Sequence, residues 1–387
     1  MSEINLNYAA TSNKKPMAMI DAMTAYLRAN NFNPSGRGGP VDHIELDCRM
    51  ALAKLFGIKN AGDMVNIIFT ASATQSLHMI INGALKQGDH VLSTSLEHNA
   101  VARPLTLLEK KGIIEVTYLP CEKGETLDPD LIKRHVRPGT RLMIMTHASN
   151  VNGAVLPYED CAKAAKELGL NFVLDAAQTA GLIDIDFERS DIDALVFTGH
   201  KTLMGPVGTG GFILKKAFAE RLEPVISGGT GSLSHLLEHP EFMPDKFQAG
   251  TPNTLGILGL SASVSFISET GSSNILAHEM RLTDMFIEGI RQEGIIIYGP
   301  KERVPIVSFN IEGVDNGVLE GVLYHKFTIA ARSGLHCSPL AHKSLGTYPT
   351  GALRISFGYF NTVSEVEYAI EAINKIISNK GEVEKWI

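Results

Sequence analysis

The chain has 387 residues, of which 44% are hydrophobic and 20% are charged, and this length is sufficient for two lobes around buried cores. A formal net charge of −7 argues against nucleic acid or an acidic membrane surface as the main partner. The apolar runs are strand-sized and the N-terminus lacks the pattern of a signal peptide, so we expect a cytoplasmic protein without transmembrane segments.

Strand-sized apolar runs alternate with helix-period segments between residues 65 and 214. Helical patterns cover residues 73–86 and 158–168, for example. Strands that alternate with helices imply crossover connections and a mostly parallel sheet. The last run follows its neighbour through a short Gly/Pro-rich turn, which allows it to be antiparallel. The strand candidates are residues 65–70, 90–95, 113–119, 141–148, 171–175, 194–198 and 209–214.

After about residue 260 the pattern changes to fewer strands among longer helices, which indicates a smaller α+β lobe. A closing helix is predicted to begin at Thr362, because Glu365 three residues later completes a capping box. We therefore expect a large domain over residues 16–258 and a small domain made of residues 1–15 and 259–387. The strand candidates of the small domain are residues 295–298, 306–311 and 353–359.

An acid and an amine follow two neighbouring strand candidates. Asp175 ends the run 171–175, and Lys201 lies three residues after the run 194–198. Open α/β sheets bind their ligands at the carboxyl ends of the strands. A lysine there can form a Schiff base, and an aspartate can keep a pyridinium nitrogen protonated, which is the pairing that pyridoxal phosphate requires. Taken singly, a helix N-cap and a surface lysine are the simpler interpretations.

Residues 69–75 follow a strand candidate and open an apolar helix, so their backbone N–H groups can bind a phosphate. An ordinary small-residue turn is the alternative. Thr198 and His200, just before Lys201, are placed to donate to the same phosphate. Two glycine-rich segments, residues 205–211 and 228–231, do not open a helix after a strand, so we reject a dinucleotide site.

Three further polar residues follow strand candidates. His98 comes after the run 90–95, where an imidazole can stack on a flat cofactor ring and move protons, or be merely solvated. Asn150 lies two residues after the run 141–148, and Gln178 lies three residues beyond Asp175, so both can reach a phenolic oxygen of such a ring. Asparagine at a strand end is otherwise a common turn residue.

Arg354 lies on a predicted strand of the small lobe, where a buried guanidinium needs either a substrate carboxylate or an acidic residue as its partner. No two of the four cysteines have the spacing of metal ligands or of a CxxC pair, so we expect reduced thiols and no metal site. Cys337 follows His336 in a segment with basic neighbours, which allows a nucleophilic thiolate, although a lone cysteine is more often structural.

Taken together, these residues resemble the class V aminotransferase superfamily and, within it, the cysteine desulfurases. The resemblance covers nearly the whole chain, from residues 7–11 to residues 360–362. It implies a pyridoxal-phosphate-dependent transferase of fold type I, with a mostly parallel seven-stranded sheet and a smaller α+β domain. The most specific matches are residues 175–178, 199–201, 247–253 and 332–337.

Carried over by position, the resemblance assigns Lys201 as the Schiff-base lysine and Asp175 as the partner of the pyridine nitrogen. His98 stacks on the ring, and Arg354 binds the substrate carboxylate. Thr251 completes the phosphate site of a second subunit, which implies a homodimer. The other assigned cofactor contacts are Asn150 and Gln178 to the phenolic oxygen, and Ala73, Thr74, Thr198 and His200 to the phosphate.

The resemblance also assigns Cys337 as the residue that receives sulfur from L-cysteine as a persulfide and passes it to an acceptor, for which a sulfur-acceptor protein is one candidate. The segment around it is similar to the SUF-type and selenocysteine-lyase-like members. Leu335 and the run 338–347 differ from the usual SUF-type pattern, which leaves the substrate and the acceptor open. Alternatives are a selenocysteine lyase acting on L-selenocysteine, a transaminase or epimerase in which Cys337 is incidental, and a partner-docking scaffold.

Overall fold

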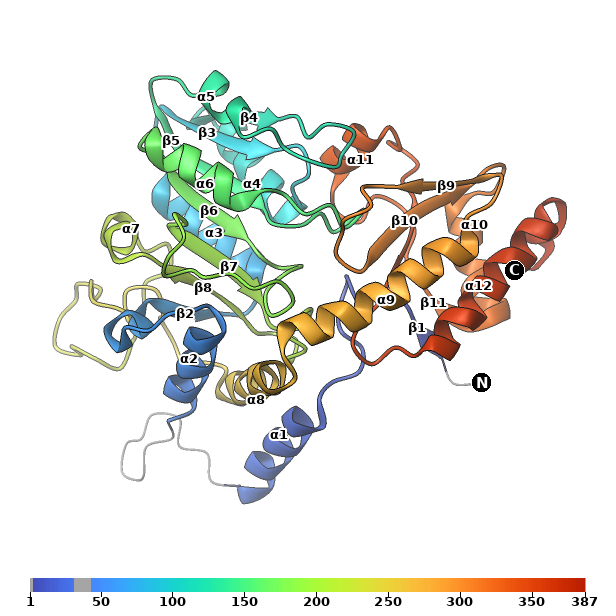
Figure 1. Ribbon diagram of the computed structural model, residues 1–387. Helices are drawn as coiled ribbons and strands as arrows, with labels where there is room; N and C mark the ends of the chain where they lie inside the picture. Colours follow the sequence, from blue (N-terminus) through green and yellow to red (C-terminus); the bar gives the residue numbers. More distant parts are fainter. Residues whose placement is uncertain (1–2, 31–42, 387) are drawn as a thin grey trace.

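Figure 1 shows a computed structural model of the chain, which describes residues 3–30 and 43–386. Its largest sheet has seven strands in the order β2-β8-β7-β6-β5-β3-β4. Every neighbouring pair is parallel except the two made by β8, so the predicted mostly parallel sheet and its antiparallel last strand are confirmed. The strands are β2 (Ile67–Thr70), β3 (Asp89–Thr94), β4 (Ile114–Leu119), β5 (Thr140–Thr146), β6 (Asn171–Asp175), β7 (Ala194–Thr198) and β8 (Gly210–Leu214).

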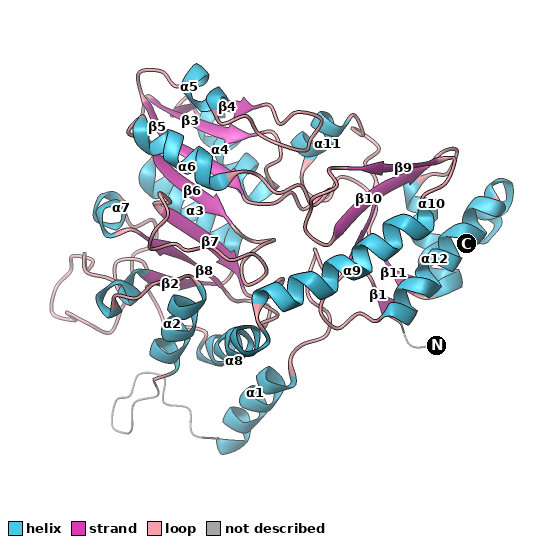
Figure 2. Ribbon diagram, in the orientation of Figure 1, coloured by secondary structure: helices cyan, strands magenta, loops and turns pink. Residues whose placement is uncertain are grey.

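Helices cover both faces of this sheet (Figure 2). Phe172 and Leu174 of β6 pack into one apolar cluster, whereas Val173 packs into a second cluster on the opposite face. Because both faces are buried, the strands are continuous apolar runs instead of alternating ones. The helices are α1 (Met17–Ala29), α2 (Ile44–Leu55), η1 (Ala61–Asn66), α3 (Ala73–Ala84), α4 (Asn99–Lys110), α5 (Asp130–His135), α6 (Tyr158–Glu167), α7 (Lys216–Arg221) and α8 (Thr254–Thr270).

A second sheet has three antiparallel strands in the order β12-β10-β9 and packs on a third apolar cluster with its own helices. Two predicted strands coincide with β9 and β10. The third was predicted over residues 353–359 and corresponds to β12, which ends three residues earlier, at Ser356. The short strand β1 (Ile4–Asn5) pairs with β11 and so joins the N-terminal segment to this part. The elements are α9 (Ser272–Ile290), β9 (Ile295–Tyr298), β10 (Ile306–Ile311), α10 (Asn316–Phe327), β11 (Ile329–Ala330), α11 (Pro339–Leu345), β12 (Leu353–Ser356), α12 (Val363–Ser378) and η2 (Lys380–Trp386).

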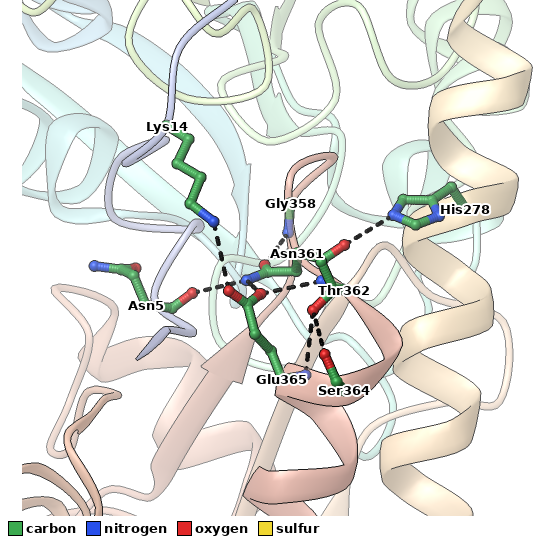
Figure 3. Close-up of polar contacts among 8 residues, drawn as sticks. All are labelled: Asn5, Lys14, His278, Gly358, Asn361, Thr362, Ser364 and Glu365. Carbon is green, nitrogen blue, oxygen red and sulfur yellow. Dashed lines mark hydrogen bonds and ion pairs between the residues drawn. The ribbon is translucent and has the colours of Figure 1, made fainter. Parts of the chain in front are cut away.

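The start of α12 is fixed by the predicted capping box, which is confirmed (Figure 3). The Thr362 hydroxyl accepts a hydrogen bond from the Glu365 N–H at 3.3 Å, and the Glu365 carboxylate accepts one from the Thr362 N–H at 3.0 Å. Asn361 donates to both Glu365 and the carbonyl of Asn5, and Lys14 pairs with Glu365. The cap therefore also holds the N-terminal segment against the second sheet.

In the sequence, helix α8 follows the strands of the large sheet and precedes those of the second sheet. It packs on both α1 and α2. The predicted boundary at residue 258 falls inside α8, and the division into two domains stays a prediction. In the described parts of the chain, we find no helix with the length and apolar character needed to cross a bilayer.

Candidate active site

A cavity of about 290 Å³ lies at the carboxyl edge of the seven-stranded sheet. Its walls come from the residues that follow five of the strands and from the segment that precedes β12. All but one of the site residues predicted from the sequence line this cavity. They are Ala73, Thr74, His98, Asn150, Asp175, Gln178, Thr198, His200, Lys201, Cys337 and Arg354.

The acid and the amine predicted as a pair both face this cavity. Asp175 is buried at the end of β6, and its Oδ1 accepts a hydrogen bond from the Ala177 N–H at 3.0 Å. Burial raises the pKa of this carboxyl, while the hydrogen bond and the positive charge of Lys201 act in the opposite direction. Burial lowers the pKa of Lys201 to about 8, with Asp175 opposing this shift and Arg354 adding to it. A useful fraction of Lys201 is therefore the neutral amine at physiological pH, the form that attacks an aldehyde.

The other end of the cavity is built to hold an anion. The Ser72 hydroxyl caps α3 by accepting a hydrogen bond from the Gln75 N–H at 3.2 Å. A Cβ at Gly210 would lie 2.8 Å from the backbone carbon of Ser72, so this glycine lets β8 pass close beneath the first turn of α3. The Thr198 hydroxyl is buried and has no hydrogen-bond partner among the described residues. An unsatisfied hydroxyl beside a helix N-terminus fits a phosphate group.

Two histidines of the cavity have neutral rings with assigned hydrogen bonds. His98 caps α4, and its Nδ1 accepts a hydrogen bond from the Ala100 N–H at 3.0 Å, so the hydrogen of the neutral ring lies on Nε2. Burial lowers the pKa of His98 to about 4, and the charge of Lys201 adds to the shift. His200 Nδ1 bonds to the Thr11 hydroxyl at 3.1 Å, and burial likewise lowers the pKa of this ring to about 4. The sequence did not predict the capping role of His98.

The side chain of Asn150 holds the loop that carries Cys337. Its Nδ2 donates to the carbonyl oxygen of His336 at 2.7 Å, and its Oδ1 accepts a hydrogen bond from the Ser338 hydroxyl at 2.7 Å. These contacts were not predictable from the sequence, because the partners are more than 180 positions apart. A contact of Asn150 with a cofactor oxygen stays a prediction. The other residue assigned to that oxygen, Gln178, donates through Nε2 to the Ala9 carbonyl at 3.0 Å.

Arg354 of β12 is buried in the cavity wall without an acidic partner. Its Nη1 donates to the Asn150 carbonyl at 2.7 Å and its Nη2 donates to Asn7 Oδ1 at 2.9 Å, while Nε is buried without a partner. The ion pairs found among the described residues do not include Arg354, so the alternative of an internal salt bridge fails. Burial and the nearby charge of Arg332 lower its pKa to about 10. A carboxylate bound here would compensate this charge.

Cys337 is exposed, whereas the other three cysteines are buried. Its φ angle is 58° and that of His336 is 48°, so two consecutive non-glycine residues adopt the left-handed conformation. The Asn99 N–H, at the start of α4, donates to the Cys337 carbonyl at 2.7 Å. The loop therefore presents the thiol to the same cavity that contains Lys201.

Thr251 is the one predicted site residue that the structure does not bring into this cavity. It is exposed and lines a neighbouring cavity of about 260 Å³ together with Ala71 and Gln75 of the β2–α3 turn. The resemblance assigned this threonine to the site of a second subunit, and that role stays a prediction. Among the described residues, no group of side chains is arranged to hold a metal ion, and none was predicted.

Glu97, next to His98 in the sequence, is a buried acid that the sequence analysis missed. Its Oε1 accepts hydrogen bonds from the Thr94 hydroxyl and the Thr146 N–H, while Oε2 is buried without a partner. Burial raises the pKa of this carboxyl to about 8, and the charge of Asp175 contributes to the shift. Glu97 is therefore mostly a neutral acid below pH 8. In the sequence, its position near a strand end was the one signal that could have pointed to it.

The fold and this cavity define a class of protein. A mostly parallel seven-stranded sheet, with a buried aspartate, a half-buried lysine and a helix N-terminus around one cavity at its carboxyl edge, is the architecture of fold type I among the pyridoxal-phosphate enzymes. The chain belongs to the aminotransferase class-V family, whose family model matches residues 4–369. This family is in general dependent on pyridoxal phosphate, so the resemblance inferred from the sequence is confirmed at this level.

The chain is similar in sequence and structure to several cysteine desulfurases. It is 32% identical to a probable cysteine desulfurase of Methanothermobacter thermautotrophicus, over 95% of this chain and 93% of that protein. It is 30% identical to a cysteine desulfurase of Haloferax volcanii, over 96% of this chain and 88% of the relative. The solved apo structure of a cysteine desulfurase from Thermococcus onnurineus NA1 has a TM-score of 0.89 and 28% identity, and the match covers 97% of this chain and 95% of that one.

Proposed function

We propose that the protein is a pyridoxal-phosphate-dependent cysteine desulfurase, which converts L-cysteine to L-alanine and receives the sulfur on Cys337 as a persulfide. The observation that carries this proposal is the exposed Cys337 thiol on the same cavity as Lys201 and the unpaired guanidinium of Arg354. A transaminase has no need of a thiol held at this position. The named relatives support the same activity.

His98 and Asp175 would hold the ring of the cofactor, Lys201 would bind its aldehyde group, and the start of α3 would hold its phosphate. When bound, the cofactor supplies a cationic ring that accepts the electron pair left after the substrate loses its α-proton. Asp175 would hold the ring nitrogen protonated. Thr198 and the first turn of α3, with Ala73 and Thr74, would donate to the phosphate, where the orphaned hydroxyl of Thr198 supports the assignment.

The residues of the chain then have distinct tasks. Arg354, which lines the cavity and has no acidic partner among the described residues, would bind the substrate carboxylate and so orient the amino acid. The neutral amine of Lys201 removes the α-proton and later returns a proton to the product carbon. The neutral ring of His98 is placed to donate a hydrogen bond from Nε2 at the mouth of the cavity.

Sulfur transfer occurs at Cys337. Its thiolate Sγ attacks the substrate sulfur, an S–S bond forms, and the C–S bond of the substrate breaks with its electron pair passing to carbon. That carbon takes up a proton, and the product leaves as alanine. One sulfur atom moves from L-cysteine to the Cys337 thiol, so the overall reaction balances without an external oxidant or reductant. Since Cys337 is exposed, a sulfur acceptor can approach the persulfide from solvent.

We also propose that the protein is a homodimer in which Thr251 completes the phosphate site of the partner subunit. Thr251 is exposed beside the β2–α3 turn, next to the proposed phosphate site. Three large apolar side chains, Leu236, Leu237 and Phe242, are exposed in the segment that precedes it. Apolar side chains gathered in one exposed segment indicate an interface.

The test compares two alanine variants that each remove one thiol, Cys337→Ala and the buried control Cys161→Ala. With L-cysteine, we expect Cys337→Ala to release alanine at least about a hundredfold more slowly than the wild type while keeping the visible absorbance of the cofactor. Cys161→Ala should retain activity. Mass spectrometry should find one extra sulfur on the Cys337 peptide of the wild type after a single turnover.

Undiminished alanine release by Cys337→Ala would show that this residue does not accept sulfur. The same variants assayed with L-selenocysteine separate the nearest alternative. Because a selenol leaves more readily than a thiol, a selenocysteine lyase should tolerate the loss of Cys337, and it should act on L-selenocysteine in strong preference to L-cysteine.

A further inference from the structure

A chain of hydrogen bonds through three buried side chains connects the loop that carries Cys337 to α11 and to the turn that follows it. His336 Nε2 bonds to the Arg332 carbonyl at 3.1 Å, and His336 Nδ1 lies 3.2 Å from His342 Nε2. His342 Nδ1 in turn bonds to the Thr347 hydroxyl at 2.7 Å. All three side chains are buried, with that of His342 completely inaccessible. We refer to His336, His342 and Thr347 as the histidine relay.

The hydrogen-bond direction along the histidine relay follows from its first acceptor. A carbonyl oxygen only accepts, so His336 must carry its hydrogen on Nε2, and its Nδ1 must accept from His342 Nε2. His342 Nδ1 is then an acceptor and receives the Thr347 hydroxyl hydrogen. Burial lowers the pKa of His336 to about 2 and that of His342 to about 4, which agrees with two neutral rings. Each ring thus has one assigned tautomer, and every polar atom of the relay is satisfied.

This arrangement bears on Cys337 because the backbone beside it is strained. Non-glycine residues rarely adopt positive φ angles, and the surrounding contacts must hold them there. The Asn150 side chain and the Asn99 N–H hydrogen-bond to the carbonyls of His336 and Cys337. The histidine relay is a second constraint on this loop, through the ring of His336.

The relay can be altered without changing the walls of the cavity. Among the described residues, those that line the cavity include His336 and Cys337 but neither His342 nor Thr347. Loss of the Thr347 hydroxyl can therefore reach the thiol through the rings of His342 and His336 without a change in a wall residue. This separates a positioning effect on Cys337 from a direct effect on the bound cofactor.

We propose that His342 and Thr347 are positioning residues that fix the conformation of the Cys337 loop for sulfur transfer. The inference rests on the proposed desulfurase activity. Loss of the Thr347 hydroxyl leaves His342 Nδ1 as a buried acceptor without a donor, and the two rings lose their fixed orientation. The thiol then spends less time where it can attack the substrate sulfur, while binding of the amino acid to the cavity is unaffected.

The decisive comparison is Thr347→Val, which removes the hydroxyl and keeps the shape, against Thr347→Ser, which restores it. Thr350→Val is the matched control, because it removes a hydroxyl from the same turn that is exposed and donates to the Thr347 carbonyl but contacts neither histidine ring. For L-cysteine we expect Thr347→Val to lower kcat about tenfold, the rate equivalent of roughly one lost hydrogen bond, with KM changed by less than about twofold. Thr347→Ser and Thr350→Val should stay near the wild type.

Two readouts do not depend on turnover. Hydrogen exchange of the peptide spanning residues 332–338 should be faster in Thr347→Val than in the wild type and in Thr347→Ser. The visible absorbance of the bound cofactor should be the same in all four proteins. Exchange and kcat of Thr347→Val at wild-type values would overturn the proposal.

If Thr347→Val does not fold, the pair His342→Gln and His342→Leu takes its place. Glutamine can donate to His336 and accept from Thr347, whereas leucine can do neither, so only the leucine variant should lose activity and protection from exchange. Equal losses in both would also overturn the proposal. Wild-type protein that releases no alanine from L-cysteine would instead refute the proposed function, and the exchange data alone would then decide whether the relay holds the loop.

Discussion

At the scale of single residues, the chemistry of the cavity depends on how burial changes the charge of two neighbouring groups. Burial raises the pKa of the Asp175 carboxyl and lowers that of the Lys201 amine, so each group is moved toward its neutral form. A cationic ring bound between them reverses the effect on Asp175, because it supplies the positive charge that the carboxylate lacks. The aspartate is therefore suited to hold a protonated ring nitrogen.

The variant Asp175→Asn tests whether the negative charge of this residue is needed. The amide still hydrogen-bonds a ring but carries no charge, so the ring loses its proton more easily and accepts electrons less well. We expect the variant to retain part of its cofactor while alanine release falls by roughly two orders of magnitude. Absorbance titration and steady-state kinetics measure the two effects. Asp193→Asn, a partly buried aspartate outside the cavity, is the control, and a variant at position 175 with the wild-type rate would contradict the argument.

Glu97 gives a prediction about stability and pH. Its pKa is about 8 in the folded chain, above its usual value, so the folded form binds the proton more tightly than the unfolded form. The resulting stabilisation is complete below the unfolded pKa and is lost as the pH rises through 8. Glu97→Gln does not titrate, so its free energy of unfolding relative to wild type should rise by on the order of 1 kcal/mol or more between pH 5 and 9.

Urea denaturation at a series of pH values measures this difference. The control is Glu288→Gln, which changes an exposed glutamate on α9 and should show no such trend. A flat difference between Glu97→Gln and wild type across that range would mean that Glu97 is ionised in the folded protein at all these pH values.

At the scale of elements, the predictable features are those set by local pattern. The strands β6 and β7 have the predicted bounds, because a sheet buried on both faces leaves an uninterrupted apolar run between polar residues. The order in which His98, Asp175 and Lys201 meet at one edge follows from parallel strands alone. The hydrogen bonds from Asn150 to the Cys337 loop were not predictable, and neither was the hydrogen bond between His336 and His342. They depend on how the segment before β12 docks on the large sheet, and on side-chain orientation within a turn.

The capping box of α12 gives a prediction at this scale. Thr362→Ala removes the acceptor for the Glu365 N–H, and a lost N-cap costs about 1 kcal/mol of stability. The same change at the other end of the helix, Ser378→Ala, should cost less, because that hydroxyl donates to the carbonyl of Asn374 within the last turn. Chemical denaturation of both variants measures the difference, and equal losses would show that the cap does not hold α12.

At the scale of the whole molecule, the cavity exists only where the two sheets meet. Arg354 comes from β12, yet its guanidinium bonds to the Asn150 carbonyl beyond β5 and to Asn7 from the N-terminal segment. The guanidinium that is proposed to bind the substrate thus lies where three separate parts of the chain meet: its own strand, the segment after β5 and the N-terminal segment. Sequence motifs locate Arg354 on its strand, but they do not indicate which of these parts orients it.

The proposed homodimer belongs to the same scale. Light scattering of the purified protein should give about twice the 41.9 kDa of one chain. Leu237→Asp places a charge on the most exposed apolar side chain and should shift the mass toward one chain, since burying an unpaired carboxylate is costly. Leu107→Asp, an exposed leucine on α4, should leave the mass unchanged. A dimer unaffected by Leu237→Asp would place the interface elsewhere.

The distribution of the thiols has a practical consequence. With three cysteines inside the protein and one in the open, a maleimide fluorophore should label a single position without any engineering of the sequence. The dye would lie in the wall of the cavity, on a loop whose backbone carbonyls are held by Asn150 and Asn99. Its emission should then report, in a titration with an amino acid, how this loop changes when the cavity fills.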